Sequence, residues 1–236
     1  MSEKKKKKPH HYGNKHISPA ELGRYIEQTL LTPNATEADV IKLCKSAIRY
    51  NFCSVCVHPY YVPLSKAILS GHETTVTTVI GFPLGMTMKN IKVYEAMQAA
   101  LYGAQELDVV LNIGAVKSGN LDYVAGELSE ILAANKSIVH TAIIETCYLT
   151  EKEKSAVTEI AAGCGVGFIK TSTGFGPKGA TDKDVKLIKN VLKDRAGVKA
   201  SGNIRTLPQV MRLIKSGAAR IGTSAGLEIM QEALAS

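Results

Sequence analysis

Long apolar runs are absent from this sequence of 236 residues. The longest are far shorter than the roughly 20 residues that cross a bilayer, so we expect no membrane span. The charged N-terminal run is not followed by an apolar segment, and we therefore expect no signal peptide. Hydrophobic residues still make up 45% of the chain, which is enough for a large core, and the length fits a single domain.

Cysteine is scarce, with five residues at positions 44, 53, 56, 147 and 164. An odd number in a large, core-forming chain suggests reduced thiols and a cytoplasmic location. Cys53 and Cys56 form a C-x-x-C pair, but no second Cys or His pair stands at zinc-site spacing from them. They lie in the strand-like run FCSVCVHP, in which residues three apart point to opposite faces. We expect packed thiols there and no metal site.

Basic residues are concentrated at the N-terminus. The first sixteen residues hold six lysines and one glutamate, a net charge of +5 out of +8 for the whole chain. We expect residues 1–16 to form a flexible, Lys-rich arm and residues 17–236 to form the folded domain. The folded part shows no zinc finger and no stripe of aromatic and basic residues, so nucleic acid is not an expected partner.

Short runs rich in Val, Ile and Thr alternate with stretches that have the apolar spacing of helices. We expect strands at 25–31, 52–58, 74–81, 106–112, 137–145, 166–172, 197–202 and 219–224. We expect helices at 36–49, 89–102, 120–134, 151–162, 181–194 and 206–216, with a short final helix after residue 224. Thr36, Thr150 and Thr181 each stand three residues before an acidic residue, a pattern typical of a helix N-terminus.

This alternation predicts an α/β fold in which eight parallel strands and their helices form a TIM (β/α)8 barrel. An open sheet is disfavoured, because no G-x-G-x-x-G turn follows the first strand. Functional groups in such barrels lie at the C-terminal ends of the strands. Those ends carry Glu27, Cys56, Asp108, Glu145, Lys170 and Lys199. Charges are costly to bury unless they are paired, so this convergence indicates a functional site.

Lys170 ends the apolar run VGFIK. Many strand-end lysines extend their ammonium group to the surface. A lysine in an apolar setting can instead become a nucleophilic amine. Its pKa is ordinarily about 10.4, and partial burial beside a second ammonium, that of Lys199, would lower this pKa to about 7 or 8.

Small residues form the turns after the last two predicted strands, KASGN at 199–203 and GTSAG at 222–226. The second turn opens the final helix. Glycines at both positions could simply turn the chain. In barrels, however, these two turns commonly bind phosphate through backbone N–H groups and the helix dipole. We therefore expect a phosphorylated ligand.

Six motifs, in order along the chain, resemble those of the deoxyribose-phosphate aldolase family. They are VIGFPLG, ELDVVLNIGAVKSG, IIETCYLT, FIKTSTGFG, VKASGNIRT and RIGTSAG. The resemblance implies a class I aldolase, a lyase without metal or cofactor, acting in deoxyribose catabolism. Such enzymes reversibly cleave 2-deoxy-D-ribose 5-phosphate to acetaldehyde and D-glyceraldehyde 3-phosphate. Family members are often dimers, so a homodimer is expected.

By the family's pattern, Lys170 forms the Schiff base, with Lys199 as its cationic neighbour and Asp108 as a proton donor and acceptor. The resemblance also implies substrate and phosphate contacts at Thr171, Gly202, Asn203, Gly222, Ser224, Glu27 and Thr29.

The sequence departs from the family at three places. Glu27 and Gln28 replace an Asp that is usually followed by His or Leu, Asn203 replaces a glycine, and the C-terminal tyrosine of some members is missing. We expect Asn203 to adopt the positive φ of the glycine, because Asn tolerates it best among the other residues.

Three other functions stay open at this stage. One is another phosphosugar enzyme on the same barrel, such as an isomerase, although an isomerase has no need of two lysines. Another is a phosphate-binding barrel without catalysis, which the changes at Glu27 and Asn203 would favour. The third is a binding protein that acts through its basic arm.

Overall fold

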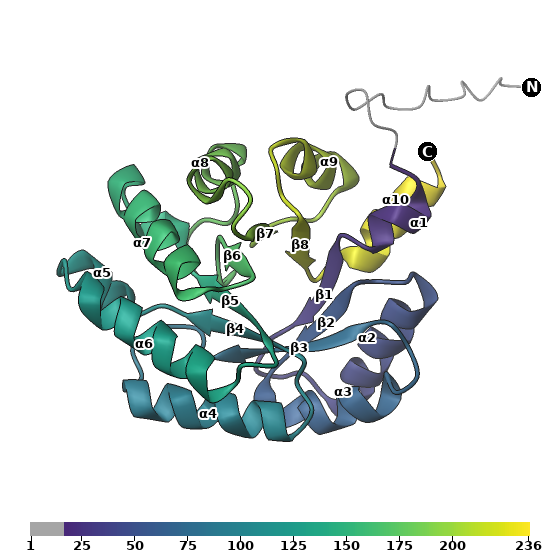
Figure 1. Ribbon diagram of the computed structural model, residues 1–236. Coiled ribbons are helices and arrows are strands. Elements are labelled where there is room, and N and C mark those ends of the chain that lie inside the picture. The colour runs from purple at the N-terminus through teal and green to yellow at the C-terminus, as the bar shows by residue number, and fades with distance from the viewer. Residues whose placement is uncertain (1–16) are drawn as a thin grey trace, which may run out of the picture.

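Eight parallel strands close into a barrel in the computed structural model, which describes residues 17–236. The strands pair in chain order, and β1 closes the barrel against β8 (Figure 1). The predicted TIM barrel is confirmed. The expected basic arm, residues 1–16, lies outside the described residues.

The strands are β1 Ile26–Leu30, β2 Ser54–Val57, β3 Thr75–Ile80, β4 Glu106–Val110, β5 Val139–Ile143, β6 Phe168–Lys170, β7 Gly197–Ser201 and β8 Arg220–Thr223. The helices are α1 Pro19–Gly23, α2 Glu37–Arg49, α3 Val62–Ile68, α4 Lys89–Leu101, α5 Ile113–Lys117, α6 Leu121–Ala134, α7 Glu151–Cys164, α8 Asp182–Leu192, α9 Leu207–Lys215 and α10 Gly226–Leu234. Two short 3₁₀ helices span Pro59–Tyr61 and Thr146–Tyr148. Each of the eight expected strands is present.

The predicted helix starts are confirmed. The side chains of Thr36, Thr150 and Thr181 each accept a hydrogen bond from the backbone N–H three residues later. Helix α3 was not predicted, because it has only seven residues, begins next to a 3₁₀ helix and carries a proline in its first turn. Short helices of this kind show little apolar periodicity.

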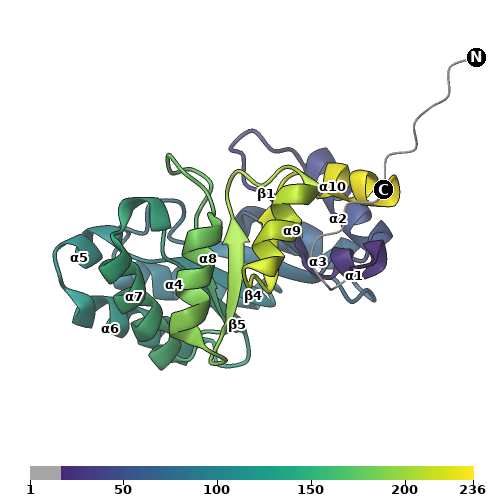
Figure 2. The same cartoon turned by 90° about the horizontal axis from the view of Figure 1, so that it is seen from above.

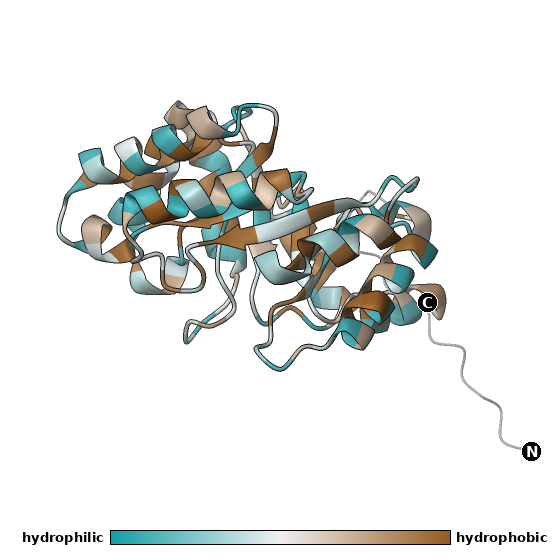
Figure 3. Cartoon of the chain, turned by 90° about the horizontal axis from the view of Figure 1, so that it is seen from below, coloured by the Kyte–Doolittle hydropathy of each residue, from teal (hydrophilic) through white to brown (hydrophobic). Residues whose placement is uncertain are grey.

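The helices form an outer layer around the strands (Figures 1 and 2). Apolar and polar residues alternate around them (Figure 3), which is the pattern expected when one face packs on the sheet. Fully buried residues such as Val55, Val198 and Ile221 fill the space between the two layers. Helices α1 and α10 lie side by side. In residues 17–236, no helix combines the length and the apolar character needed to span a bilayer.

Register determines what faces the barrel interior. Lys170 on β6 lies directly opposite Lys199 on β7. Partner residues on neighbouring strands point to the same face of a sheet. Both lysines therefore project into the barrel near the C-terminal ends of its strands, where the predicted functional residues were expected to meet.

Candidate active site

Four charged side chains from four strands meet inside the barrel. Lys170 Nζ lies 2.6 Å from Asp108 Oδ2, and Lys199 Nζ lies 2.9 Å from Asp108 Oδ1. Lys199 Nζ also lies 2.7 Å from Glu27 Oε2. All four residues are buried, with Lys170 the most exposed at 2%. The cluster pairs two cations with two carboxylates, which offsets the cost of burying each charge.

Glu27 belongs to this cluster although its side chain is one methylene longer than the Asp expected at this position. Its Oε2 accepts hydrogen bonds from Lys199 and from Ser54 Oγ, the latter at 2.9 Å. Its Oε1 has no hydrogen-bond partner and lies 3.6 Å from Lys170 Nζ. The longer side chain therefore still contacts the lysine pair, and its second oxygen faces Lys170.

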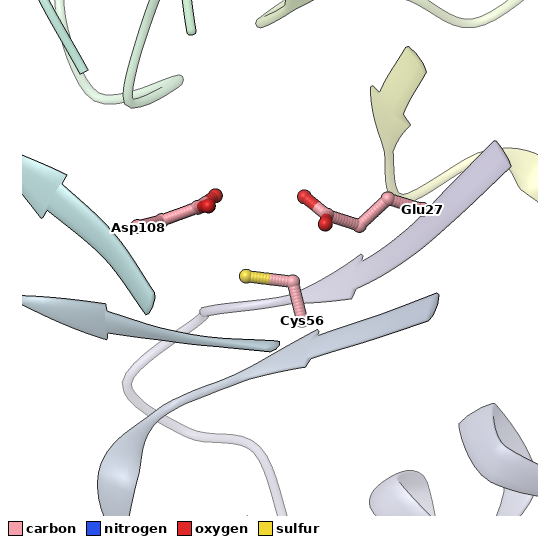
Figure 4. Close-up of side chains that lie close together, drawn as sticks. All are labelled: Glu27, Cys56 and Asp108. Carbon is pink, nitrogen blue, oxygen red and sulfur yellow. The ribbon is translucent and has the colours of Figure 1, made fainter. Parts of the chain in front are cut away.

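Cys56 points toward the same centre from β2 (Figure 4). Donor atoms of Glu27, Cys56 and Asp108 lie within 4.8 Å of one another, a grouping that could in principle hold a metal ion. Both carboxylates, however, already bind lysine ammonium groups. Burial raises the pKa of the Cys56 thiol well above its ordinary value, so this residue is a neutral thiol. The donor set therefore suits the two lysines better than a metal cation.

Opposite charges outweigh burial in setting the pKa values of the cluster. Burial lowers the pKa of Lys170, but negative charge nearby, above all that of Asp108, raises it by more than burial lowers it, so the net pKa lies above its ordinary value. The pKa of Lys199 is raised in the same way. The pKa of Asp108 is lowered, because Lys170 and Lys199 outweigh the opposing effect of burial. The lowered pKa expected for Lys170 was therefore wrong for this arrangement, in which Asp108 holds the amine as an ammonium ion.

A pocket of about 300 Å³ opens above Lys170. The predicted residues Thr29, Gly202, Asn203, Gly222 and Ser224 line it together with Lys170. Thr173, Gly174 and Phe175, from the loop after β6, line it as well. The pocket thus connects the lysine to the two turns that the sequence marked as a phosphate site.

The turn after β7 has the backbone shape expected for it. Asn203 has a φ of 58° and the preceding Gly202 a φ of 88°. The prediction that Asn203 adopts a positive φ is confirmed. Arg205, two residues further on, also lines the pocket and was not singled out from the sequence. Lys170 and Arg205 are the only charged residues among the described residues that line this pocket.

Two predicted contact residues do not line this pocket. Glu27 lies beneath it in the ion cluster. Thr171 is fully buried and joins β6 to β7, because its Oγ1 donates to Ser201 O at 3.2 Å and accepts from Ser201 N at 3.1 Å. The geometry thus gives Thr171 a role in holding the strand that carries Lys199.

Glu145, another of the predicted strand-end residues, lies outside the ion cluster and holds a loop in place. It has a left-handed backbone, with a φ of 46°, and its buried carboxylate accepts hydrogen bonds from Thr173 N and Oγ1. Glu145 therefore fastens the loop that follows Lys170 to the end of β5.

Residues 24–232 match the model of the DeoC/LacD family of aldolases. The chain belongs to this family. A deoxyribose-phosphate aldolase of Thermococcus gammatolerans is 49% identical over 217 residues, which are 90% of this chain and 96% of that protein. The resemblance inferred from the six motifs is confirmed.

Solved structures of aldolases share the fold of this chain. An aldolase called QR15 superposes with a TM-score of 0.87 and 43% identity over 91% of this chain and 96% of its own. A deoxyribose phosphate aldolase of Aeropyrum pernix, described as a tetramer, has a TM-score of 0.85 and 33% identity, with 91% of each chain covered. As a family member, the protein is an aldolase on a TIM barrel.

Proposed function

We propose that this aldolase cleaves 2-deoxy-D-ribose 5-phosphate to acetaldehyde and D-glyceraldehyde 3-phosphate through a Schiff base on Lys170. The observation that supports this most is the pocket itself. A buried lysine in contact with a carboxylate lies at its base, and two turns suited to phosphate line its other end. A nucleophilic amine and an anion site in one cavity fit a phosphorylated aldehyde.

The first step requires the neutral amine of Lys170. Asp108 Oδ2, at 2.6 Å, is the nearest base to which the ammonium can pass its proton. The positive charge of Lys199, on the other oxygen of Asp108, favours departure of a proton from the cluster. The amine then adds to the aldehyde carbon C1, and loss of water gives the iminium ion.

The iminium ion accepts the electrons of the C2–C3 bond. A base removes the proton of the C3 hydroxyl group, the bond breaks, and glyceraldehyde 3-phosphate leaves behind an enamine on Lys170. The enamine takes a proton on C2, and water hydrolyses the resulting imine to release acetaldehyde and the free amine. Asp108 and Lys199, acting through a water molecule, are the groups that we assign to both proton transfers.

The phosphate binds at the other end of the pocket in this proposal. Backbone N–H groups of a left-handed turn such as Gly202–Asn203 form a concave anion site. The turn at Ser224 precedes α10, whose N-terminal dipole favours an anion. Arg205 adds a full positive charge beside them.

Reductive trapping tests the function. Borohydride added with acetaldehyde should attach one ethyl group to the protein, and peptide mass mapping should locate it at Lys170. Lys92, which is also buried and ion-paired, serves as an internal control and should stay unlabelled. Label at Lys199, or no label at all, contradicts the assignment.

We further propose that the protein forms a homodimer through the outer face of α4. The exposed residues of this helix are Asn90, Ile91, Tyr94, Met97 and Leu101, and none of them is charged. Leu84, Met86, Met88 and Tyr102, just before and after the helix, are exposed as well. An apolar face of this extent usually contacts another protein.

A second copy of the chain fits this face, because an isologous contact puts the same patch on both sides and an uncharged, apolar patch can pack against itself. If the two-fold axis is perpendicular to α4, the two helices run antiparallel, and the Ile91 end of one meets the Leu101 end of the other. Met97→Glu would place two negative charges, one from each copy, in this contact. Light scattering should show a dimer for the natural chain and a monomer for Met97→Glu. Leu234→Glu, at an exposed apolar residue of α10, is the control and should stay dimeric; a monomeric natural chain contradicts the proposal.

We also propose a cytoplasmic location. All five cysteines are unpaired, as is usual in a reducing compartment. The pKa of Cys53 is raised by burial to about 11, which keeps this thiol protonated and unreactive. Thiol titration of protein isolated under non-reducing conditions should find all five cysteines free.

A further inference from the structure

Gln28 is a buried polar residue in a place where an apolar one is usual. Successive side chains of a strand point to opposite faces, so Glu27 points into the barrel and Gln28 points outward, toward α10. The space between barrel and helices is otherwise filled by residues such as Ile26 and Ile229. Gln28 is only 4% exposed, and its amide is costly to bury unless its hydrogen bonds are satisfied.

Both ends of the Gln28 amide bind the backbone of the turn after β8. Its Nε2 donates to Ser224 O at 3.2 Å, and its Oε1 accepts from Gly226 N at 3.0 Å. Gly226 leaves no room for a Cβ atom against Gln28 Oε1, so the approach is close. One side chain therefore spans the turn that joins β8 to the first residue of α10.

Thr223 connects this turn to the turn after β7. Its Oγ1 donates to Ile204 O at 2.6 Å and accepts from Ala225 N at 3.0 Å. The two turns that line the pocket are thus joined to each other, and Gln28 fastens the pair to β1. Gln28 itself does not line the catalytic pocket.

We propose that Gln28 is a positioning residue for the phosphate group of the substrate. Gln28 sets the direction of the backbone from Ser224 to Gly226. Through Thr223, it also sets the spacing between the two phosphate-binding turns. This inference rests on the proposed function, because it needs a phosphate in that end of the pocket. Without the two hydrogen bonds, the turn from Ser224 to Gly226 is no longer held in one orientation, and it binds the phosphate group less tightly.

Kinetics with two substrates test the inference. Gln28→Met has a similar volume and no amide. It should raise KM for 2-deoxyribose 5-phosphate by about tenfold, equivalent to about 1.4 kcal/mol. The kcat should stay within about twofold, and kcat/KM for unphosphorylated 2-deoxyribose should not change, since a positioning effect on phosphate cannot reach a substrate that lacks it. Inhibition by inorganic phosphate should weaken by the same factor as KM rises.

Two further variants complete the design. Gln28→Leu also removes both hydrogen bonds and adds no charge near the phosphate, so it should show the same selective rise in KM and decides the question if Gln28→Met does not fold. Gln231→Met, on the exposed side of α10, is the matched control and should behave like the natural chain.

Equal changes with both substrates, or no change with either, would overturn the role of Gln28. Reductive trapping with acetaldehyde needs no phosphate, so it separates this outcome from a failure of the proposed function. If Lys170 of the natural chain is trapped and phosphate affinity is unaffected by Gln28→Met, only the positioning role is lost.

Discussion

Lys170 and Lys199 lie opposite each other on neighbouring strands, and their ammonium groups bind the two oxygens of one carboxylate, that of Asp108. Two like charges so close repel each other, and the shared anion holds them together. The protonation state of either lysine therefore depends on Asp108. Substitutions in this group of three should change pH dependence as well as rate.

Asp108→Asn should lower the pKa of Lys170. The carboxylate raises this pKa in the natural protein, so its removal leaves burial and Lys199 to act against a weaker opposing charge. The acid limb of reductive trapping with acetaldehyde should move to lower pH, because more of the amine is neutral at a given pH. Turnover of the phosphorylated sugar should nevertheless fall by orders of magnitude, since the nearest proton acceptor is lost. A limb that moves to higher pH contradicts this account.

Lys199→Leu should shift the same limb in the opposite direction. It removes the neighbouring cation and frees Glu27, whose Oε1 already lies 3.6 Å from Lys170 Nζ. Both changes raise the pKa of Lys170, so the neutral amine forms only at higher pH. Turnover at neutral pH should fall by orders of magnitude and recover in part as pH rises. A pH–rate profile with an unchanged acid limb means that Lys199 does not control the amine.

Asn203→Gly should change phosphate affinity by only a few-fold, about 1 kcal/mol or less, because both residues accept the φ of 58°. Asn203→Val should weaken binding of the phosphorylated sugar far more, since a β-branched residue resists a positive φ. The measurement is KM for 2-deoxyribose 5-phosphate beside KM for 2-deoxyribose. If valine raises both equally, or neither, Asn203 is not part of the phosphate site.

Lys92→Met should destabilise the fold. Lys92 Nζ lies 2.8 Å from Glu127 Oε2 and donates to Val110 O at 2.9 Å, and both charged side chains are fully buried. Loss of the cation leaves an unpaired buried carboxylate, a change that typically costs about 3–5 kcal/mol. The double variant Lys92→Met/Glu127→Leu should regain much of this loss in urea denaturation. Arg24→Met, which breaks the exposed pair with Glu73, should leave the denaturation midpoint nearly unchanged.

Features that depend on residues close together in the sequence were predictable from the sequence alone. Runs rich in Val, Ile and Thr located all eight strands, and helical spacing located six of the ten helices of residues 17–236, because each pattern is complete within about a dozen residues. The GTSAG turn located α10 as a seventh helix. The order of those elements was enough to predict the barrel, since parallel strands at regular intervals along the chain have few other possible arrangements. It also placed Lys170, Lys199 and Asp108 at strand ends, and the φ of Asn203 followed from its place in a glycine-type turn.

Only the tertiary structure decided how the charged groups affect one another. Asp108 contacts Lys170 across 62 positions and Lys199 across 91, and Glu27 contacts Lys199 across 172. The sign of a pKa shift depends on these distances, and the sequence does not contain them. It placed Asp108 and both lysines at strand ends but did not show that the carboxylate of Asp108 lies between the two ammonium groups. The role of Gln28 was hidden for the same reason, because its partners, Ser224 and Gly226, meet it only when β8 closes the barrel against β1.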